Sequence, residues 1–315
     1  MAEPRALAEG VACAAGAGLL WGLVFVAPLM LPDYPGPVLS VGRYLAFGIV
    51  ALGLAVPDRA ALARLTPADW REAAKLAAVG NLAYYACLAT ALQWAGATLP
   101  TLMIGTLPLV IALCANLGAG GQALPWARLA PPLGLIAAGL GLAHSLPAGE
   151  GQAASASYVA GVALAAGAVA CWTWYPIRNA RWLQARPGLP SRAWATAQGL
   201  ATLPLALLGV AVLAAWPPLA PGFPPPLGPR PLAFVGLMFA IGIGASWLGT
   251  LLWNRASRLL PTALSGQLIV FETLAALLYA FIWQERPPTA QELTGIALLV
   301  AGVIAGVRAF REGKN

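Results

Sequence analysis

The residue with the clearest chemical potential in this sequence is Glu272, near the middle of an apolar run at residues 262–283. A carboxyl group inside such a run is costly, and it generally binds a ligand, carries a proton or pairs with another polar group. Ser265, Glu272 and Tyr279 recur every seven residues, so one helix face would carry all three. We predict that this face lines a cavity and that Glu272 binds an ammonium group or carries a coupled proton. The structural alternative is a protonated carboxyl group hydrogen-bonded to a neighbouring helix.

Arg43 is a second charged side chain inside an apolar run, about one and a half turns into residues 38–56. Its guanidinium could extend along the helix to the membrane surface, as long basic side chains do near helix ends. It could instead bind a carboxylate or pair with Glu272, because the two backbones are expected within ~10 Å of the same depth. The sequence leaves both interpretations open.

Polar and aromatic side chains that could complete a site lie in four other apolar runs. Asn81 and Tyr85 are one helical turn apart, so with Tyr84 they would line a polar path or hydrogen-bond a neighbouring helix. Four tryptophans are expected deep in the membrane, where they would form the walls of a site for a flat or apolar ligand or simply pack in the core. They are Trp21, Trp172, Trp174 and Trp247.

Ten apolar segments must position these side chains. They lie at residues 11–30, 38–56, 73–94, 98–118, 128–146, 158–178, 192–215, 231–252, 262–283 and 290–308. A helix needs ~20 mainly apolar residues to cross a bilayer. Of the 315 residues, 60% are hydrophobic and 9% are charged, whereas a soluble domain carries ~25% charge. We therefore predict an all-α integral membrane protein with ten transmembrane helices, the first of which is kept rather than cleaved as a signal.

The basic residues predict how the chain is oriented. Fifteen of the eighteen Lys and Arg residues fall on one side if there are ten crossings, and the positive-inside bias makes that side cytoplasmic. Both termini are then cytoplasmic, in the inner membrane of a bacterial-type cell. The net charge of +7 is attributed to loops beside anionic membrane lipid, so no nucleic-acid partner is expected.

The sequence contains no pattern of an enzyme or a cofactor-binding protein. There is one histidine, His144, and no nucleotide-binding loop, metal-ligand spacing or nucleophile elbow. The four cysteines fall within apolar runs, which is typical of packing residues. We expect no catalytic residue, no metal and no cofactor.

The second half of the chain echoes the first. Residues 16–21 align with 167–172, residues 98–108 with 262–272, and residues 135–139 with 298–302. Two five-helix repeats, at residues 1–150 and 151–315, would have opposite topology because five is an odd number. Inverted repeats of this kind are typical of secondary transporters, whose halves rock about a site near the midplane.

This layout resembles the drug/metabolite transporter (DMT) superfamily, specifically its EamA-type members, over residues 10–310. The resemblance is carried by Trp21, by the Pro-Val-Leu-Ser-Val-Gly-Arg motif at residues 37–43, by Glu285 and by Gly302. The chain departs from the family where Glu272 replaces a proline that matches Pro108, and where 121–122 are Gly-Gln instead of containing a glutamate. Among the branches, the tryptophan-rich interior most resembles the YddG-type aromatic amino acid exporters.

The resemblance implies a monomeric secondary transporter that works by alternating access and exports aromatic or other large neutral amino acids, or related small metabolites. The alternatives are a broad-specificity drug/metabolite exporter of the same fold, an intramembrane enzyme and a channel. The expected substrate-binding residues are Glu272, Arg43, Asn81, Tyr84, Tyr85, Trp21, Trp172, Trp247, Ser265 and Tyr279.

Overall fold

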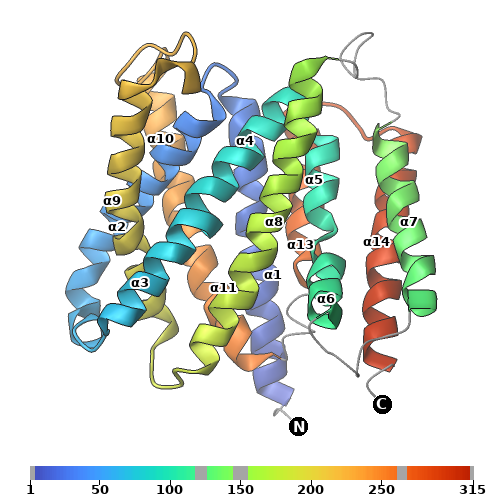
Figure 1. The fold of residues 1–315 in the computed structure, drawn as a ribbon, viewed down its shortest axis with the longest axis horizontal. Helices are drawn as coiled ribbons and strands as arrows, with labels where there is room; N and C mark the ends of the chain where they lie inside the picture. Colours follow the sequence, from blue (N-terminus) through green and yellow to red (C-terminus); the bar gives the residue numbers. More distant parts are fainter. Residues whose placement is uncertain (1–3, 118–125, 145–154, 261–267, 313–315) are drawn as a thin grey trace.

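The computed structural model describes residues 4–117, 126–144, 155–260 and 268–312, and no strand occurs among them. The helices lie roughly side by side in a single bundle (Figure 1). Six helical stretches are long and apolar enough to cross a membrane: Arg5–Met30, Gly36–Leu62, Pro67–Ala95, Ala156–Leu183, Ser191–Ala215 and Pro231–Leu259. Shorter apolar helices occur at Ala130–Gly139, Val270–Trp283 and Ala290–Ala305. The chain is therefore an all-helical membrane protein with several spans.

Six of the predicted helices are uninterrupted. They are α1 (Pro4–Met30), α2 (Gly36–Leu62), α7 (Trp126–His144), α8 (Ala156–Gln184), α9 (Ser191–Ala215) and α14 (Ala290–Glu312). Several of these helices are longer than their apolar runs, because the charged residues that flank each run at the membrane surface are helical as well. Pro176 and Pro204 lie inside α8 and α9 without ending them.

Two long helices contain a π-helical turn in the middle. The first is α3 (Pro67–Leu76), η1 (Ala77–Ala83) and α4 (Tyr84–Ala95). The second is α10 (Pro231–Ile241), η4 (Gly242–Leu248) and α11 (Gly249–Leu259). A π-helical turn widens the backbone and leaves peptide groups available to other partners, and it is frequent at functional sites.

The helices predicted at 98–118 and 262–283 are not continuous. The first is divided into α5 (Thr98–Gly105) and α6 (Leu107–Leu117) at Thr106. Pro108 follows directly, and a proline removes a helical hydrogen bond and crowds the preceding turn. The described part of the second is α13 (Val270–Trp283), which follows a turn at Ile269. Glu272 therefore lies in the first turn of a helix, and the expectation that it stands in the middle of an unbroken helix is wrong.

The ends of two elements are fixed by side chains. Thr66 and Asp69 cap the start of α3 reciprocally, and Pro67 occupies its first turn, as its sequence predicts. The connection before α10 contains a short 3₁₀ turn, η3 (Pro217–Leu219), and is held by the hydroxyl of Tyr34, which donates to the Leu227 carbonyl. A hydrogen bond from Arg230 lowers the pKa of the Asp33 carboxyl group below its ordinary value at this end of the bundle.

Helices far apart in the sequence pack together. The closest pairs are α2 with α9, α7 with α14, α4 with α8, and α1 with both α11 and α13. Figure 1 shows α1 in the middle of the bundle, with α7 and α14 together at one side. Gly18 and Gly22 of α1 touch α13 so closely that a Cβ on Gly22 would lie 2.7 Å from that of Ala275. This approach places α1 directly against the turn that carries Glu272.

Candidate functional site

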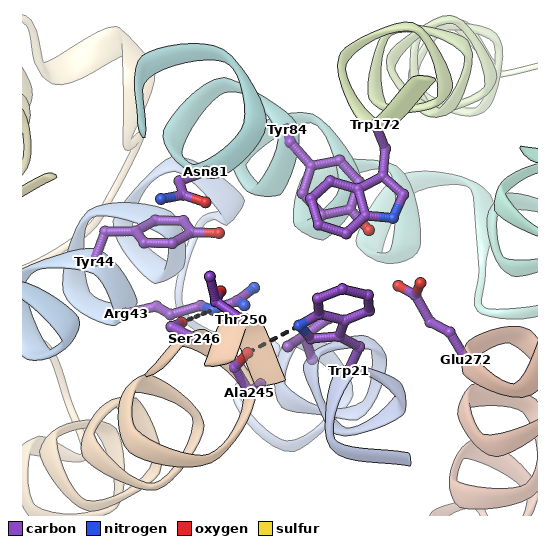
Figure 2. A pocket seen from close by; sticks show the side chains of 11 residues that line it. Trp21, Arg43, Tyr44, Asn81, Tyr84, Trp172, Ala245, Ser246, Thr250 and Glu272 are labelled. Carbon is purple, nitrogen blue, oxygen red and sulfur yellow. Dashed lines mark hydrogen bonds between the residues drawn. The ribbon is translucent and has the colours of Figure 1, made fainter. Parts of the chain in front are cut away.

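A small, partly enclosed cavity lies where α1, α2, η1, α4, α8, η4, α11 and α13 converge (Figure 2). It has a volume of about 10 Å³, which is room for about one water molecule. Its lining residues are Trp21, Val24, Arg43, Tyr44, Asn81, Tyr84, Trp172, Ala245, Ser246, Thr250 and Glu272. Both halves of the chain contribute to this lining.

Six of the ten predicted site residues line this cavity, namely Trp21, Arg43, Asn81, Tyr84, Trp172 and Glu272. Of the other four, the three that the structure describes do not line it. Tyr85 is buried beside Arg43, Trp247 is half-buried and donates to Thr196, and Tyr279 is half-buried on α13. Ser265 lies outside the described residues.

Arg43 is buried, with 4% of its surface exposed, and its side chain does not reach toward the membrane surface. Its Nε donates to the Ser246 hydroxyl at 2.9 Å, and its guanidinium carbon lies 4.6 Å and 4.9 Å from the ring centres of Tyr85 and Tyr44. Two aromatic faces thus stabilise the cation. Its Nη1 has no hydrogen-bond partner. No ion pair of Arg43 is found within the described ranges, so one donor of a buried cation remains available to a ligand.

Glu272 is also buried, with 1% of its surface exposed, and its Oε2 has no hydrogen-bond partner. The hydroxyl of Tyr84 and the indole nitrogen of Trp172 are buried beside this carboxyl group, and neither makes a hydrogen bond of ordinary geometry within the described residues. Figure 2 shows the Glu272 carboxyl group directed toward these two side chains across the cavity. Buried polar groups are nearly always paired, and each one left unpaired costs about 1–3 kcal/mol. Four such groups around one cavity call for a water molecule or a ligand between them.

Aromatic rings form the wall between Arg43 and Glu272. The Trp172 ring stacks on Tyr84 at 4.7 Å between centroids and on Tyr175 at 4.9 Å, with interplanar angles of 18° and 7°. Trp21 meets Trp172 edge-on at 5.2 Å. This arrangement gives the cavity a flat apolar wall with polar groups at its two ends, which suits a ligand with an apolar body.

The π-helical turns provide backbone acceptors beside the cavity. The indole nitrogen of Trp21 donates to the Ala245 carbonyl of η4 at 2.9 Å, and the Ser40 hydroxyl donates to the Leu82 carbonyl of η1 at 2.8 Å. Asn81, within η1, donates its amide to the Thr202 hydroxyl at 3.2 Å. The widened turns thus hold α1 and α2 in place around the site.

Five lining residues were not predicted from the sequence: the apolar Val24 and Ala245, and the polar Tyr44, Ser246 and Thr250. Ser246 and Thr250 are four residues apart on one helix face, a spacing that could have identified them. Tyr44 directly follows Arg43, and its position on the cavity depends on packing that no local pattern reveals. No cluster of three or more His, Cys, Asp or Glu side chains that could hold a metal occurs in the described part of the chain.

The apolar helices and the buried polar cavity define an integral membrane protein with several spans. No family model matches the chain. The inner membrane protein YtfF of Escherichia coli (strain K12) is 48% identical to it, over 96% of this chain and 96% of that protein. The chain belongs to the family of YtfF and is a multi-pass inner membrane protein.

A solved structure described only as the crystal structure of a protein shares the fold. Its TM-score is 0.62 at 22% sequence identity, over 98% of this chain and 99% of that chain. At this identity the likeness concerns the fold alone.

Proposed function

We propose that this protein is a secondary transporter of zwitterionic small molecules, with neutral amino acids that have large side chains as its substrates. The observation that carries the proposal is a buried arginine and a buried carboxyl group facing one cavity, each with an unpartnered polar atom. An amino acid presents one charge of each sign and would satisfy both groups. The stacked rings of Trp172, Tyr84 and Tyr175 would accommodate its apolar side chain.

The architecture proposed is two inverted five-helix repeats. The two seven-residue π-helical segments support it, because η1 begins at Ala77 and η4 at Gly242, 165 positions later. The repeat seen in the sequence has nearly the same spacing, since Thr98 aligns with Thr262, 164 positions later. The aligned helices that begin at Leu107 and Val270 both follow a turn. Packing is consistent with this symmetry, because α2 contacts η4 and α9 contacts η1.

Alternating access follows from this architecture as a mechanism. Because the cavity lies between the halves, rocking of one half against the other would open it to one side of the membrane at a time. Arg43 would bind the carboxylate, with Ser246 holding its Nε, and Glu272 would bind the ammonium group or carry a coupled proton. One chain encloses the whole cavity, so the proposed working unit is a monomer without catalytic activity. The direction, export from the cytoplasm, rests on the resemblance to EamA-type exporters.

Counterflow in proteoliposomes tests the substrate class. Vesicles loaded with unlabelled tryptophan, leucine, alanine or glutamate are assayed for uptake of labelled tryptophan. The key probes are two analogues that lack one charge each, tryptamine and indole-3-propionate. We expect saturable exchange with tryptophan and leucine, and a loss of about 10–100-fold with either analogue, the effect of one hydrogen bond to a charged group.

The possible results distinguish the alternatives. Tryptamine that exchanges as well as tryptophan would indicate a broad-specificity drug exporter in place of a zwitterion carrier. An unsaturable ion current would indicate a channel, and a chemically altered product would indicate an enzyme.

A further inference from the structure

A second hollow lies away from the central cavity, on the side of the bundle between α6 and α8. It is an open groove of about 540 Å³, within the ~300–1,000 Å³ of typical ligand pockets. Figure 1 shows α6 beside α8, at the end of the bundle where the N-terminus lies. The groove is lined by Val110, Cys114, Ala166, Val169, Ala170, Thr173, Trp174, Ile177, Arg178 and Arg181.

One face of α8 forms most of this groove. Its lining positions, 166, 169, 170, 173, 174, 177, 178 and 181, follow the three- and four-residue spacing of a single helix stripe. The first six positions along the stripe carry small or apolar side chains or a threonine, and the last two carry arginines. The hydroxyl of Thr173 donates to the Val169 carbonyl at 2.7 Å, so its polar group is already satisfied within the helix. The groove is therefore apolar along its length and basic at one end.

The two arginines are not equivalent. Arg178 is bound to the Glu72 carboxylate of α3 through two hydrogen bonds, so most of its charge is compensated. Arg181 is exposed, and no ion pair that includes it is found in the residues described. The end of the groove thus carries net positive charge beside a large exposed ring, Trp174, which is 37% exposed.

We propose that this groove binds an anionic phospholipid. One acyl chain would lie along the apolar stripe of α8, between Val110 and Trp174, and the headgroup phosphate would bind Arg181 with a contribution from Arg178. Charge complementarity identifies the occupant, because an apolar channel that ends in an unpaired guanidinium matches an acyl chain that ends in a phosphate. Basic pockets between helices near the membrane surface select anionic headgroups in this way. The proposal rests on the membrane location of the chain and is independent of what the central cavity transports.

The position of the groove suggests a consequence for the bundle. The lipid phosphate and the Glu72 carboxylate would both lie near Arg178, which joins α8 to α3. A lipid that binds only the folded protein stabilises it by mass action, so the purified protein should be more stable in the presence of the anionic lipid.

Lipid binding to the purified full-length protein in detergent tests the proposal. Native mass spectrometry and thermal unfolding are followed during titration with dioleoylphosphatidylglycerol or dioleoylphosphatidylcholine, which share acyl chains and differ in headgroup charge. We expect tighter binding and a larger rise in unfolding temperature with phosphatidylglycerol. Arg181→Gln should reduce the preference for phosphatidylglycerol about fivefold, the effect of one basic side chain near the headgroups.

Two controls make the result specific. Arg71→Gln removes an exposed basic residue of α3 that does not line the groove, and it should keep the wild-type preference. Ala170→Trp should fill the groove and weaken the binding of both lipids. Equal binding of both lipids by the wild type, or an unchanged preference in Arg181→Gln, would overturn the proposal. Displacement of the lipid by glycerol phosphate at similar concentration would also overturn it, because the site would then recognise a free anion.

Discussion

Glu72 of α3 and Arg178 of α8 form a two-bond ion pair that joins the first half of the chain to the second. The Arg178 Nη2 lies 3.0 Å from the Glu72 Oε2, and the Nε of the same guanidinium donates to Oε1. Glu72 is 2% exposed and Arg178 is 43% exposed, so the pair is buried on one side and open on the other. A two-bond geometry of this kind is stronger and more directional than a single contact.

The same relationship recurs across the molecule. Within the described ranges, every Asp or Glu of the first half is paired with an arginine of the second half: Glu9 with Arg255, Asp33 with Arg230, Asp58 with Arg192, Asp69 with Arg186 and Glu72 with Arg178. Four of these pairs join elements that meet at the end of the bundle where the N-terminus lies (Figure 1). If the halves rock, these pairs must break when the cavity opens at that end.

We predict that reversing the charges of Glu72 and Arg178 will show that this ion pair holds the two halves together at this end of the bundle. Glu72→Arg or Arg178→Glu alone should lower the unfolding temperature and favour opening at this end, because two like charges then face each other. The double reversal should recover most of both effects, since it restores the attraction. Unfolding temperature and the labelling rate of a reporter cysteine at Ala185 measure the two effects.

The matched control is the Glu9–Arg255 pair, in which both side chains are about half exposed and 2.8 Å apart. Exposed pairs contribute little, so its single reversals should change both readouts only slightly. Glu72→Gln keeps the shape of the side chain if Glu72→Arg does not fold. A double reversal no better than the single variants would contradict the pairing role.

Much of the helical layout could be predicted from the sequence. Runs of ~20 apolar residues mark the spans, and Thr66 with Pro67 marks the start of α3, because both signals are local. The π-helical turns η1 and η4 could not be predicted, since no local pattern marks them and they pack against helices distant in the sequence, η1 against α8 and α9 and η4 against α1 and α2. The break at Thr106 has a local signal in Pro108, whereas the break at Ile269, just before Glu272, has no such signal beside it.

The composition of the site was partly predictable for a related reason. A buried charge is rare enough in an apolar run to attract attention, which identified Arg43 and Glu272. Aromatic residues are common in both cores and sites, so periodicity could not separate Trp172, which lines the cavity, from Trp247, which does not. That distinction requires the three-dimensional packing of α8 and η4.

The orientation of the chain is a prediction that cysteine labelling can check. In a variant that lacks the native cysteines at 13, 87, 114 and 171, Leu219→Cys should react with an impermeant reagent added to intact cells. Leu219 suits this purpose because it is 43% exposed, whereas the adjacent Ala220 is buried. Ala185→Cys, at the end of α8, should react only after the cells are permeabilised. Labelling of Ala185→Cys in intact cells would reverse the proposed topology.

Glu272→Gln should separate binding from proton coupling. Glutamine keeps the size and hydrogen bonding of the side chain but removes its charge and its titration. We expect a fall of about 10–100-fold in kcat/KM for zwitterions, which corresponds to ~1.5–3 kcal/mol for a hydrogen bond to a charged group. If protons are coupled, uptake driven by a pH gradient should be lost while downhill exchange persists.

The matched control for this variant is Glu285→Gln, which changes the same residue type at an exposed position outside the cavity. It should transport like the wild type. Wild-type kinetics in Glu272→Gln, at full protein yield, would mean that the carboxyl group has only a structural role.

The stacked aromatic wall should determine substrate size. The Trp172 ring stacks on Tyr84 and Tyr175 and lines the cavity. Trp172→Ala should therefore weaken the binding of tryptophan and leucine by about 1–3 kcal/mol, and the binding of alanine much less. Trp247→Ala removes the same side chain from a half-buried position off the cavity, where its Nε1 donates to the Thr196 hydroxyl at 3.4 Å. It should leave the ranking of substrates unchanged. Counterflow with each substrate measures both variants, and equal losses for alanine and tryptophan in Trp172→Ala would show that the ring does not contact the substrate.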